Sequence, residues 1–424
     1  MFIFACQFVY YNVLIMKRMR LLSVVLSLLC SVMAMAQFES MELPGQTSCL
    51  RIYDNKLYAA TNDGVYCCDV GQSGGWSRYG FSGLDVQDFV KNDETMLVKN
   101  DLQIFRSTDN GKTYHDVTNE VVQHEKKQLA LYRFAQVDND PKRLFMTYSV
   151  EDPNNWGLNM VHICRSDDGG LSWTDICPLG GTVHSFVTAD ISIDPADENH
   201  IIVWGGDNAM DSEPLMLFET FDGFTTTAYH ILHDEVQPEI VWPQYISDMF
   251  FFGHEDEMVI ANNPFWGMLT RERDGGEWGY ANTENGLRFI RMTDCVIDDA
   301  LYGLSIKEKE ERAFLQMWRS TNSGKTWLLK ASQDVEGQQI PQAPRPAWQM
   351  TEKAGVIYIF GKQRIFYYMT EGATGIREAS PLYDKGLMTK GTWYSLDGRQ
   401  QSARIRGLNI VREADGSVRK VIVR

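Results

Sequence analysis

The stretch RSTDNGKTY, residues 106–114, decides the fold because the chain repeats its pattern twice more. RSDDGGLSW follows at 165–173 and RSTNSGKTW at 319–327, and each copy keeps the Arg, the Ser, an acid or Asn, the Gly, a hydroxyl residue and a final aromatic residue. In such a turn the Ser and Asp oxygens accept hydrogen bonds from nearby amides, and the Gly takes a positive φ. Recurrence of the turn indicates repeated structural units.

Around the repeated turns the chain reads as units of four short strands. The strands are rich in β-branched and aromatic residues, and Asp-Pro turns stand at 140–141 and 194–195. The same order fits five further segments, which are 46–80, 84–118, 245–281, 288–331 and 346–372. Four-stranded units of roughly 40 residues predict an all-β fold, a β-propeller of about seven blades with six as the alternative. The seventh unit lacks the turn, and we expect a strand from the N-terminus to complete it.

The second turn carries the full Asp-box, S-x-D-x-G-x-x-W, at Ser166, Asp168, Gly170 and Trp173. Residues 46–372 therefore resemble the sialidase-like, sortilin-like and xyloglucanase-like β-propellers. The other two turns match with Tyr or Asn at one position each, through Ser107, Asp109, Gly111 and Tyr114, and through Ser320, Asn322, Gly324 and Trp327. We expect a structural role for all twelve residues, since Asp and Ser are common in turns.

Strand turns alternate between the two ends of a blade, so the loops between second and third strands gather opposite the repeated turns. These loops contain acids and aromatic residues that form the candidate ligand face: Asp63, Asp101, Asp152, Trp156, Asp207, Asp211 and Trp266. Rings that stack on sugars and carboxylates that bind hydroxyls are what a carbohydrate site needs.

The resemblance implies two hydrolase patterns, and the sequence departs from both. Sialidases carry an early R-I-P motif, whereas Arg51-Ile52 is followed by Tyr53. Xyloglucanase-like enzymes carry an Asp in the first blade where this chain has Asn62, unless Asp63 replaces it from a shifted position. An amide cannot act as a general base. We therefore assign no catalytic residue, favour a protein without catalysis, and expect no cofactor and no metal site.

The N-terminal segment resembles an export signal. Basic residues at 17, 18 and 20 precede an apolar run at 21–36, which ends in the A-x-A pattern Ala34-Met35-Ala36. We place the signal region at 1–36, with the translation start at Met16 or Met19; a two-segment membrane anchor is the rival interpretation. The run is short for a membrane span, so we expect no stable span in the mature chain. The predicted location is extracellular or at the cell surface, with the periplasm as the alternative.

An oxidising destination would allow disulfides. Cys164 and Cys177 flank the second repeated turn, and we predict a disulfide between them if their strands are in register.

The C-terminal segment differs from the rest in charge. Residues 388–424 carry eight Lys/Arg against three Asp/Glu, whereas 37–387 carry 29 against 53. We divide it into a linker at 373–390 and a tail at 391–424. The tail resembles the sorting signals of type IX secretion through Tyr394, Leu396, Gly398, Arg399, Lys420, Val421 and Val423. This resemblance implies export and sorting machinery as partners.

The net charge of −16 argues against a nucleic-acid partner. The favoured function is non-catalytic binding of a glycan or of a surface or secreted protein. The alternatives are a glycoside hydrolase of sialidase or xyloglucanase type and a propeller that acts as a scaffold in protein assembly.

Overall fold

The computed structural model describes most of residues 38–370 and four strands near the C-terminus. The described ranges are 38–70, 75–123, 127–151, 159–176, 186–207, 216–231, 236, 246–252, 258–264, 267–281, 286–295, 297–309, 312–335, 349–353, 355–361, 364–370, 392–394, 400–401, 407–412 and 418–423.

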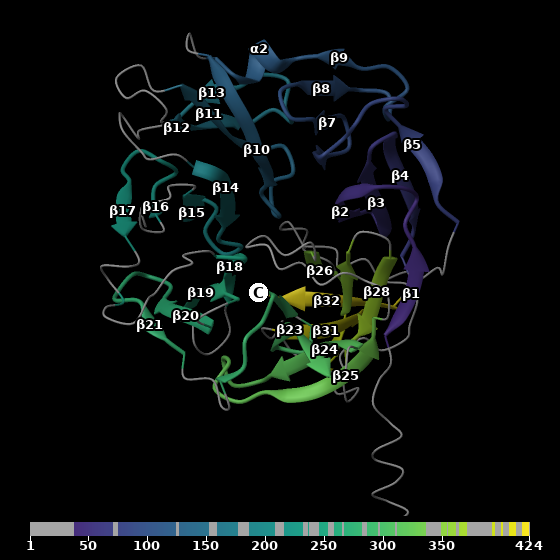
Figure 1. Cartoon of the computed structure of the whole chain (residues 1–424), viewed down its shortest axis with the longest axis vertical. Coiled ribbons are helices and arrows are strands. Elements are labelled where there is room, and N and C mark those ends of the chain that lie inside the picture. Colours follow the sequence, from purple (N-terminus) through teal and green to yellow (C-terminus); the bar gives the residue numbers. More distant parts are fainter. Residues whose placement is uncertain are drawn as a thin grey trace, which may run out of the picture.

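Seven four-stranded antiparallel sheets follow one another around a ring, which confirms the predicted seven-bladed β-propeller. Figure 1 shows the blades in chain order around a centre that β2, β10, β14, β18 and β26 approach most closely. In each of the first six blades the strands pair in sequence order, from the innermost to the outermost. The one helix in the described ranges is the single turn α2 (Thr118–Val121).

The strand bounds follow the predicted units closely. Blade 1 contains β2 (Thr47–Tyr53), β3 (Lys56–Thr61), β4 (Gly64–Asp69) and β5 (Ser77–Gly80), and blade 2 contains β6 (Asp88–Lys91), β7 (Met96–Lys99), β8 (Ile104–Ser107) and β9 (His115–Asp116). Blade 3 contains β10 (Gln128–Gln136), β11 (Leu144–Glu151), β12 (Asn159–Ser166) and β13 (Thr174–Asp175), and blade 4 contains β14 (Phe186–Ile193), β15 (Ile201–Asp207), β16 (Met216–Thr220) and β17 (Ala228–Ile231).

Blades 5 and 6 continue the same order. Blade 5 contains β18 (Asp248–Phe252), β19 (Met258–Asn263), β20 (Gly267–Glu272) and β21 (Gly279–Tyr280), and blade 6 contains β22 (Arg291–Cys295), β23 (Ala300–Lys309), β24 (Arg312–Ser320) and β25 (Leu328–Asp334). The sixth blade thus ends three residues beyond the predicted unit.

The two ends of the ring segment meet in blade 7. Its strands are β26 (Gln349–Lys353), β27 (Val356–Phe360), β28 (Arg364–Met369) and, as the outermost, β1 (Glu39–Glu42). β1 pairs antiparallel with β28, with Glu39 opposite Tyr367. The predicted N-terminal closing strand is confirmed.

The apolar core lies between neighbouring blades. At the first seam Tyr58 of β3 packs near Phe89 of β6, with ring centroids 6.4 Å apart, and both rings are buried. The same kind of contact between adjacent sheets recurs around the ring, so each blade is stabilised by its two neighbours.

Each repeated turn connects the third strand of a blade to the fourth. In blade 2, Ser107 Oγ accepts a hydrogen bond from the Gly111 amide at 2.8 Å and donates one to Asp109 at 2.9 Å. Asp109 also accepts from the amide of Thr113 at 2.9 Å and from its hydroxyl at 2.7 Å. These bonds hold the pKa of Asp109 down at about 2, chiefly through the Thr113 amide.

Three more blades have this hydrogen-bond pattern. Ser166 and Asp168 make it in blade 3, and Thr220 and Asp222 make it in blade 4. In blade 6, Asn322 accepts from the Thr326 amide at 2.9 Å and donates to the Thr326 hydroxyl at 2.9 Å. An amide side chain therefore replaces the carboxylate without loss of the turn.

The tail strands form a separate four-stranded sheet. Its order is β30 (Gln400–Gln401), β29 (Thr392–Tyr394), β31 (Gly407–Arg412) and β32 (Val418–Val423), and these strands pair only with one another among the described strands.

Candidate functional site

The described part of the candidate ligand face consists of Asp63, Asp101 and the strand end at Asp207. Asp63 lies in the turn between β3 and β4, and Asp101 lies between β7 and β8. Asp207 ends β15. Four other predicted members, which are Asp152, Trp156, Asp211 and Trp266, lie outside the described residues.

Both described loop carboxylates, Asp63 and Asp101, are engaged by neighbouring side chains. Arg78 Nη2 donates to Asp63 at 2.5 Å, and the Gly83 amide donates to its other oxygen at 3.0 Å. The hydrogen bond from Arg78 is the main reason that the pKa of Asp63 lies below its ordinary value. Asp101 accepts from Gln87 Nε2 at 2.5 Å. Because its pKa is lowered, the carboxylate of Asp63 is a poor proton donor at neutral pH.

Charged side chains on the innermost strands pair across the blade seams. Arg51 of β2 lies 2.9 Å from Asp88 of β6, and Arg133 of β10 lies 2.9 Å from Asp190 of β14. On the far side of the ring Arg291 of β22 lies 3.0 Å from Asp248 of β18. Such pairs hold neighbouring blades in a fixed relation, because each partner belongs to a different blade.

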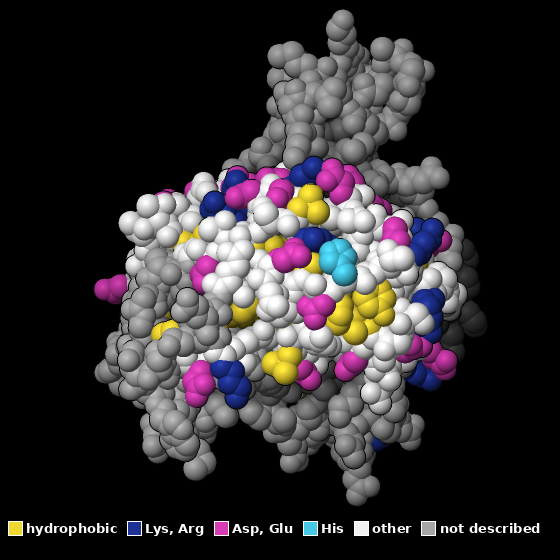
Figure 2. Space-filling model, turned by 90° about the horizontal axis from the view of Figure 1, so that it is seen from above, with side chains coloured by type: hydrophobic (Ala, Val, Ile, Leu, Met, Phe, Trp, Pro, Cys, Tyr) yellow, Lys and Arg dark blue, Asp and Glu magenta, His cyan; other side chains and the backbone are white. Residues whose placement is uncertain are grey.

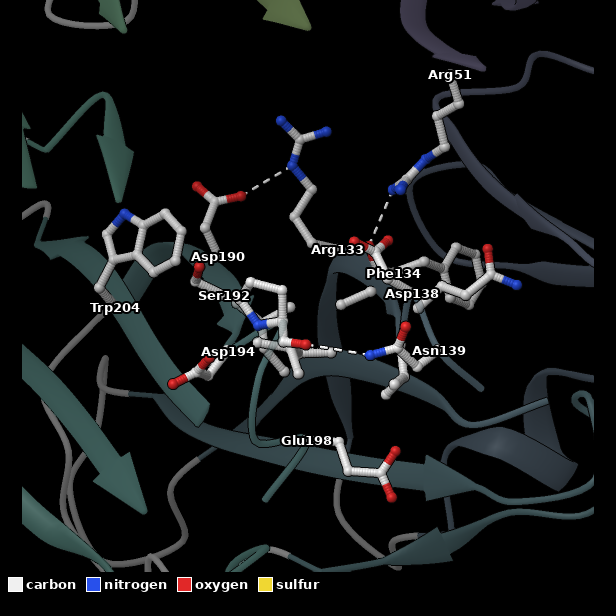
Figure 3. A pocket seen from close by; sticks show the side chains of 16 residues that line it. Arg51, Arg133, Phe134, Asp138, Asn139, Asp190, Ser192, Asp194, Glu198 and Trp204 are labelled. Carbon is white, nitrogen blue, oxygen red and sulfur yellow. Dashed lines mark hydrogen bonds and ion pairs between the residues drawn. The ribbon is translucent and has the colours of Figure 1, made fainter. Parts of the chain in front are cut away.

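A pocket opens beside two of these pairs, between β10 and β14. Its volume is about 340 Å³. Figure 3 shows Arg133 and Asp190 facing one another across the pocket and Arg51 reaching in from blade 1. The lining combines these charges with three further acids, Asp138, Asp194 and Glu198, and with Ser192 and apolar side chains from both strands.

Arg133 is the polar centre of the pocket. Its Nε donates to Asp190 at 2.9 Å, whereas its two terminal nitrogens make no hydrogen bond with any residue in the described ranges. Figure 3 likewise joins them to none of the side chains drawn. Burial works to lower the pKa of Arg133, but Asp190 and Asp88 outweigh it and raise the pKa. The guanidinium therefore stays charged, and beside its pair with Asp190 it has two terminal nitrogens without a partner among the described residues.

Trp204 adds a second unsatisfied donor. It lies on β15 in the pocket lining, its side chain is 7% exposed, and its Nε1 has no partner within the described part of the chain. Buried polar groups are normally hydrogen-bonded, so one without a partner needs an explanation.

A buried ionic cluster lies next to the pocket and links blades 4 and 5. His200 Nδ1 lies 3.2 Å from Asp194 and His200 Nε2 lies 2.6 Å from Glu219. Arg271 pairs with the same Glu219 at 2.5 Å, and Arg273 pairs with Asp194. Because buried charges are costly without partners, this cluster fixes the seam that carries Asp194, a pocket-lining residue.

The pocket was not predicted from the sequence. Arg51 was considered only as part of Arg51-Ile52, the start of a sialidase-like R-I-P motif. Arg133, Asp190 and Trp204 belong to no motif in the sequence. The signal that could have found them is positional, since the first and second strands of each unit supply the side chains that face the ring centre.

The predicted disulfide stays a prediction. Cys164 is a buried free thiol whose Sγ lies 3.5 Å from the Met146 carbonyl oxygen, and Cys177 lies outside the described residues. Within the described ranges, no group of three or more His, Cys, Asp and Glu side chains is placed to hold a metal ion. None of the described helices has the length and apolarity that a membrane crossing requires.

The outer edge of the ring has no single dominant chemistry. Figure 2 shows acidic and basic side chains interspersed on this edge, with apolar side chains in small groups.

Comparisons with known proteins identify the fold class. No known protein family matches the sequence. No curated protein matches it either. Among solved structures, Raptor of Chaetomium thermophilum aligns with a TM-score of 0.50 at 8% identity over 79% of this chain and 29% of its own.

Two other structures are similar. "YCF48 bound to D1 peptide" gives a TM-score of 0.46 at 14% identity, over 79% of this chain and 97% of that chain. The GH74 xyloglucanase of Xanthomonas campestris gives 0.47 at 14% identity, over 88% of this chain and 59% of its own. At these identities the likeness concerns the fold alone, and the assignment as a seven-bladed β-propeller rests on the sheet topology of this chain.

Proposed function

We propose that this protein is an exported Asp-box propeller that binds an anionic group of a glycan or protein without catalysis, in the pocket between β10 and β14. The observation that carries the proposal is the pair of terminal nitrogens of Arg133, which make no hydrogen bond with any described residue and lie in a pocket of about 340 Å³. Arginine binds carboxylates and other oxyanions through two parallel hydrogen bonds, which suits a planar or tetrahedral anion.

The rest of the lining supports a polar ligand. Asp138 and Ser192 can accept hydrogen bonds from hydroxyl or amide groups. A ligand that carries both an anionic group and such donors could pair with these residues and with the terminal nitrogens of Arg133 together.

The state of Asp63 argues for binding over hydrolysis. Asp63 follows Asn62, which stands where xyloglucanase-like enzymes carry the Asp of their first blade. The hydrogen bond from Arg78 keeps the pKa of Asp63 low. A glycosidase needs one carboxyl group whose pKa is raised so that it can protonate the leaving group. The hydrolase alternative is one outcome of the test below.

The test is a parallel screen of the purified chain 37–424 on glycan and peptide arrays, with hydrolysis followed on the same glycans. Binding to acidic members that Arg133→Gln removes supports the proposal. Arg312→Gln is the matched control, because Arg312 is an exposed arginine of blade 6 away from the pocket. Glycan hydrolysis that requires Asp63, Asp152 or Asp211 contradicts the proposal, and loss of binding in Trp156→Ala or Trp266→Ala places the site on the loop face.

Export and sorting form the second part of the proposal. The signal at 1–36 would deliver the chain across the inner membrane, and the tail sheet β29–β32 would address a sorting machine. The tail strands pair only among themselves within the described strands, which supports a separable unit.

Deletion of 391–424 should therefore leave the propeller folded but retained in the periplasm. The measurement is fractionation with a protease-resistance assay on each fraction. Normal extracellular levels of the truncated protein would contradict the sorting role, and a truncated protein that does not fold would show that the tail belongs to the ring.

A further inference from the structure

The closing strand begins directly behind the predicted cleavage site. Phe38 is 6% exposed and its ring packs against Phe366 and Tyr368, with centroids 6.4 and 6.1 Å away. β1 starts with the next residue and pairs with β28 along its whole length. Met41, on the same strand, is 5% exposed. Blade 7 thus uses the chain from Phe38 onward as part of its fold.

We propose that removal of the export signal must precede closure of the ring, so that only the processed chain completes blade 7. The proposal rests on the export signal of the proposed function. It adds an order of events, in which cleavage after Ala36 releases the strand that closes the propeller.

Covalent geometry gives the physical reason. Two peptide units separate the Cα atoms of Ala36 and Phe38, and they span at most about 7 Å. A signal that is still inserted in the bilayer would hold the membrane surface within about that distance of Phe38, which packs against β28. A peptidase also needs an extended segment on both sides of the bond that it cuts, and in the closed ring the chain is packed into blade 7 from Phe38 onward.

The order of synthesis leaves time for cleavage. Glu39 and Tyr367, whose side chains hydrogen-bond in the closed ring, are 328 residues apart. Among the propeller strands β1 crosses the membrane first and its partner β28 crosses last, so β1 waits unpaired while the other blades are translocated. Until it docks, β28 presents an unpaired strand edge, and such edges are prone to aggregation and proteolysis.

The experiment compares three full-length chains in cells made permeable to an added protease. The wild type is processed. Ala36→Leu places a bulky residue at the cleavage site and retains the signal. The third chain carries the same Ala36→Leu change and adds a linker of about 12 Gly and Ser residues directly before Gln37, which spans roughly 20 Å.

The readout is the rate at which peptides from 349–370 are released, followed by mass spectrometry. We expect release about tenfold faster from Ala36→Leu than from the wild type, because proteolysis tracks the open population. The linker chain should return to the wild-type rate while keeping its signal, since the tether no longer reaches the ring.

Two results would contradict the proposed order of events. One is that the Ala36→Leu precursor releases the 349–370 peptides as slowly as the wild type. The other is that the linker chain releases them as fast as Ala36→Leu. The wild-type N-terminus tests the export proposal separately. A mature protein that retains residues 17–36 refutes the export signal. A wild type that begins at Gln37, together with an Ala36→Leu precursor that resists the protease, refutes only the proposed order of cleavage and ring closure.

Discussion

The repeated turns and the pocket between β10 and β14 differ in how completely their polar groups are hydrogen-bonded. Asp109 in the first turn accepts bonds from Ser107 and from both donors of Thr113. In the pocket, the terminal nitrogens of Arg133 and the indole nitrogen of Trp204 have no partner within the described ranges. Polar groups that are fully hydrogen-bonded within the protein contribute to its stability, whereas accessible groups without a partner can bind a ligand. The turns should thus respond to mutation in stability alone and the pocket in affinity.

The largest stability effect is expected from Gly111→Ala. Gly111 has φ +76°, and an added Cβ would lie 2.8 Å from the Cα of Gly80 and 2.8 Å from the ring of Phe81. Left-handed strain and overpacking together should lower the free energy of unfolding by about 2–4 kcal/mol, with ligand affinity unchanged. The measurement is denaturant unfolding.

Gly83→Ala is the matched control for that change. Gly83 has φ +78°, but nothing lies within 4 Å of an added Cβ. Only the strain remains, so the loss should be about 1–2 kcal/mol. Equal losses in the two variants would show that the contact with the Gly80 backbone has no cost.

Asp168→Ala should lower stability by about 1 kcal/mol through the lost turn bonds, and leave affinity unaltered. Asp168→Asn should lose less, since Asn322 already fills this role in blade 6. An affinity loss without a change in melting temperature would break the comparison, because it would place ligand contacts at a turn.

The smallest effect is a pH dependence at Asp109. Its pKa in the folded chain is about 2 against an ordinary value of 3.8. A depressed pKa gives stability that is complete above the ordinary value and is lost as the pH falls towards 2. The difference in melting temperature between the wild type and Asp109→Asn should therefore shrink between about pH 4 and pH 2. If the difference in melting temperature stays constant across this range, the negative charge of Asp109 does not contribute to the stability of the turn.

The sequence predicts the blades because each one is local. Four strands and a turn such as 106–114 lie within one short segment, and even the closing strand could be expected from the turn missing in the seventh unit. The pocket could not be predicted in this way. Arg133 and Asp190 are 57 residues apart and meet only because neighbouring inner strands lie side by side.

The ligand-face prediction shows the same limit. Asp63 stands in a loop that the repeat pattern locates correctly. Its partner Arg78 lies on the outermost strand of the blade, and that pairing determines its pKa. Residue type and position could be read from the chain, but the protonation behaviour depends on a tertiary contact.

The central claim is that Arg133 holds an anionic group, and titration with small probes tests it most directly. Glucuronate and an acetylated, amidated aspartate would each be compared with its neutral analogue, glucose and the corresponding asparagine derivative, by calorimetry on the chain 37–424. We predict that at least one acidic probe binds about tenfold or more tightly than its neutral analogue, the range expected for hydrogen bonds to a charged group. This preference should vanish in Arg133→Gln and persist in Arg312→Gln. Acidic and neutral probes that bind alike, or a preference that survives Arg133→Gln, would contradict the account.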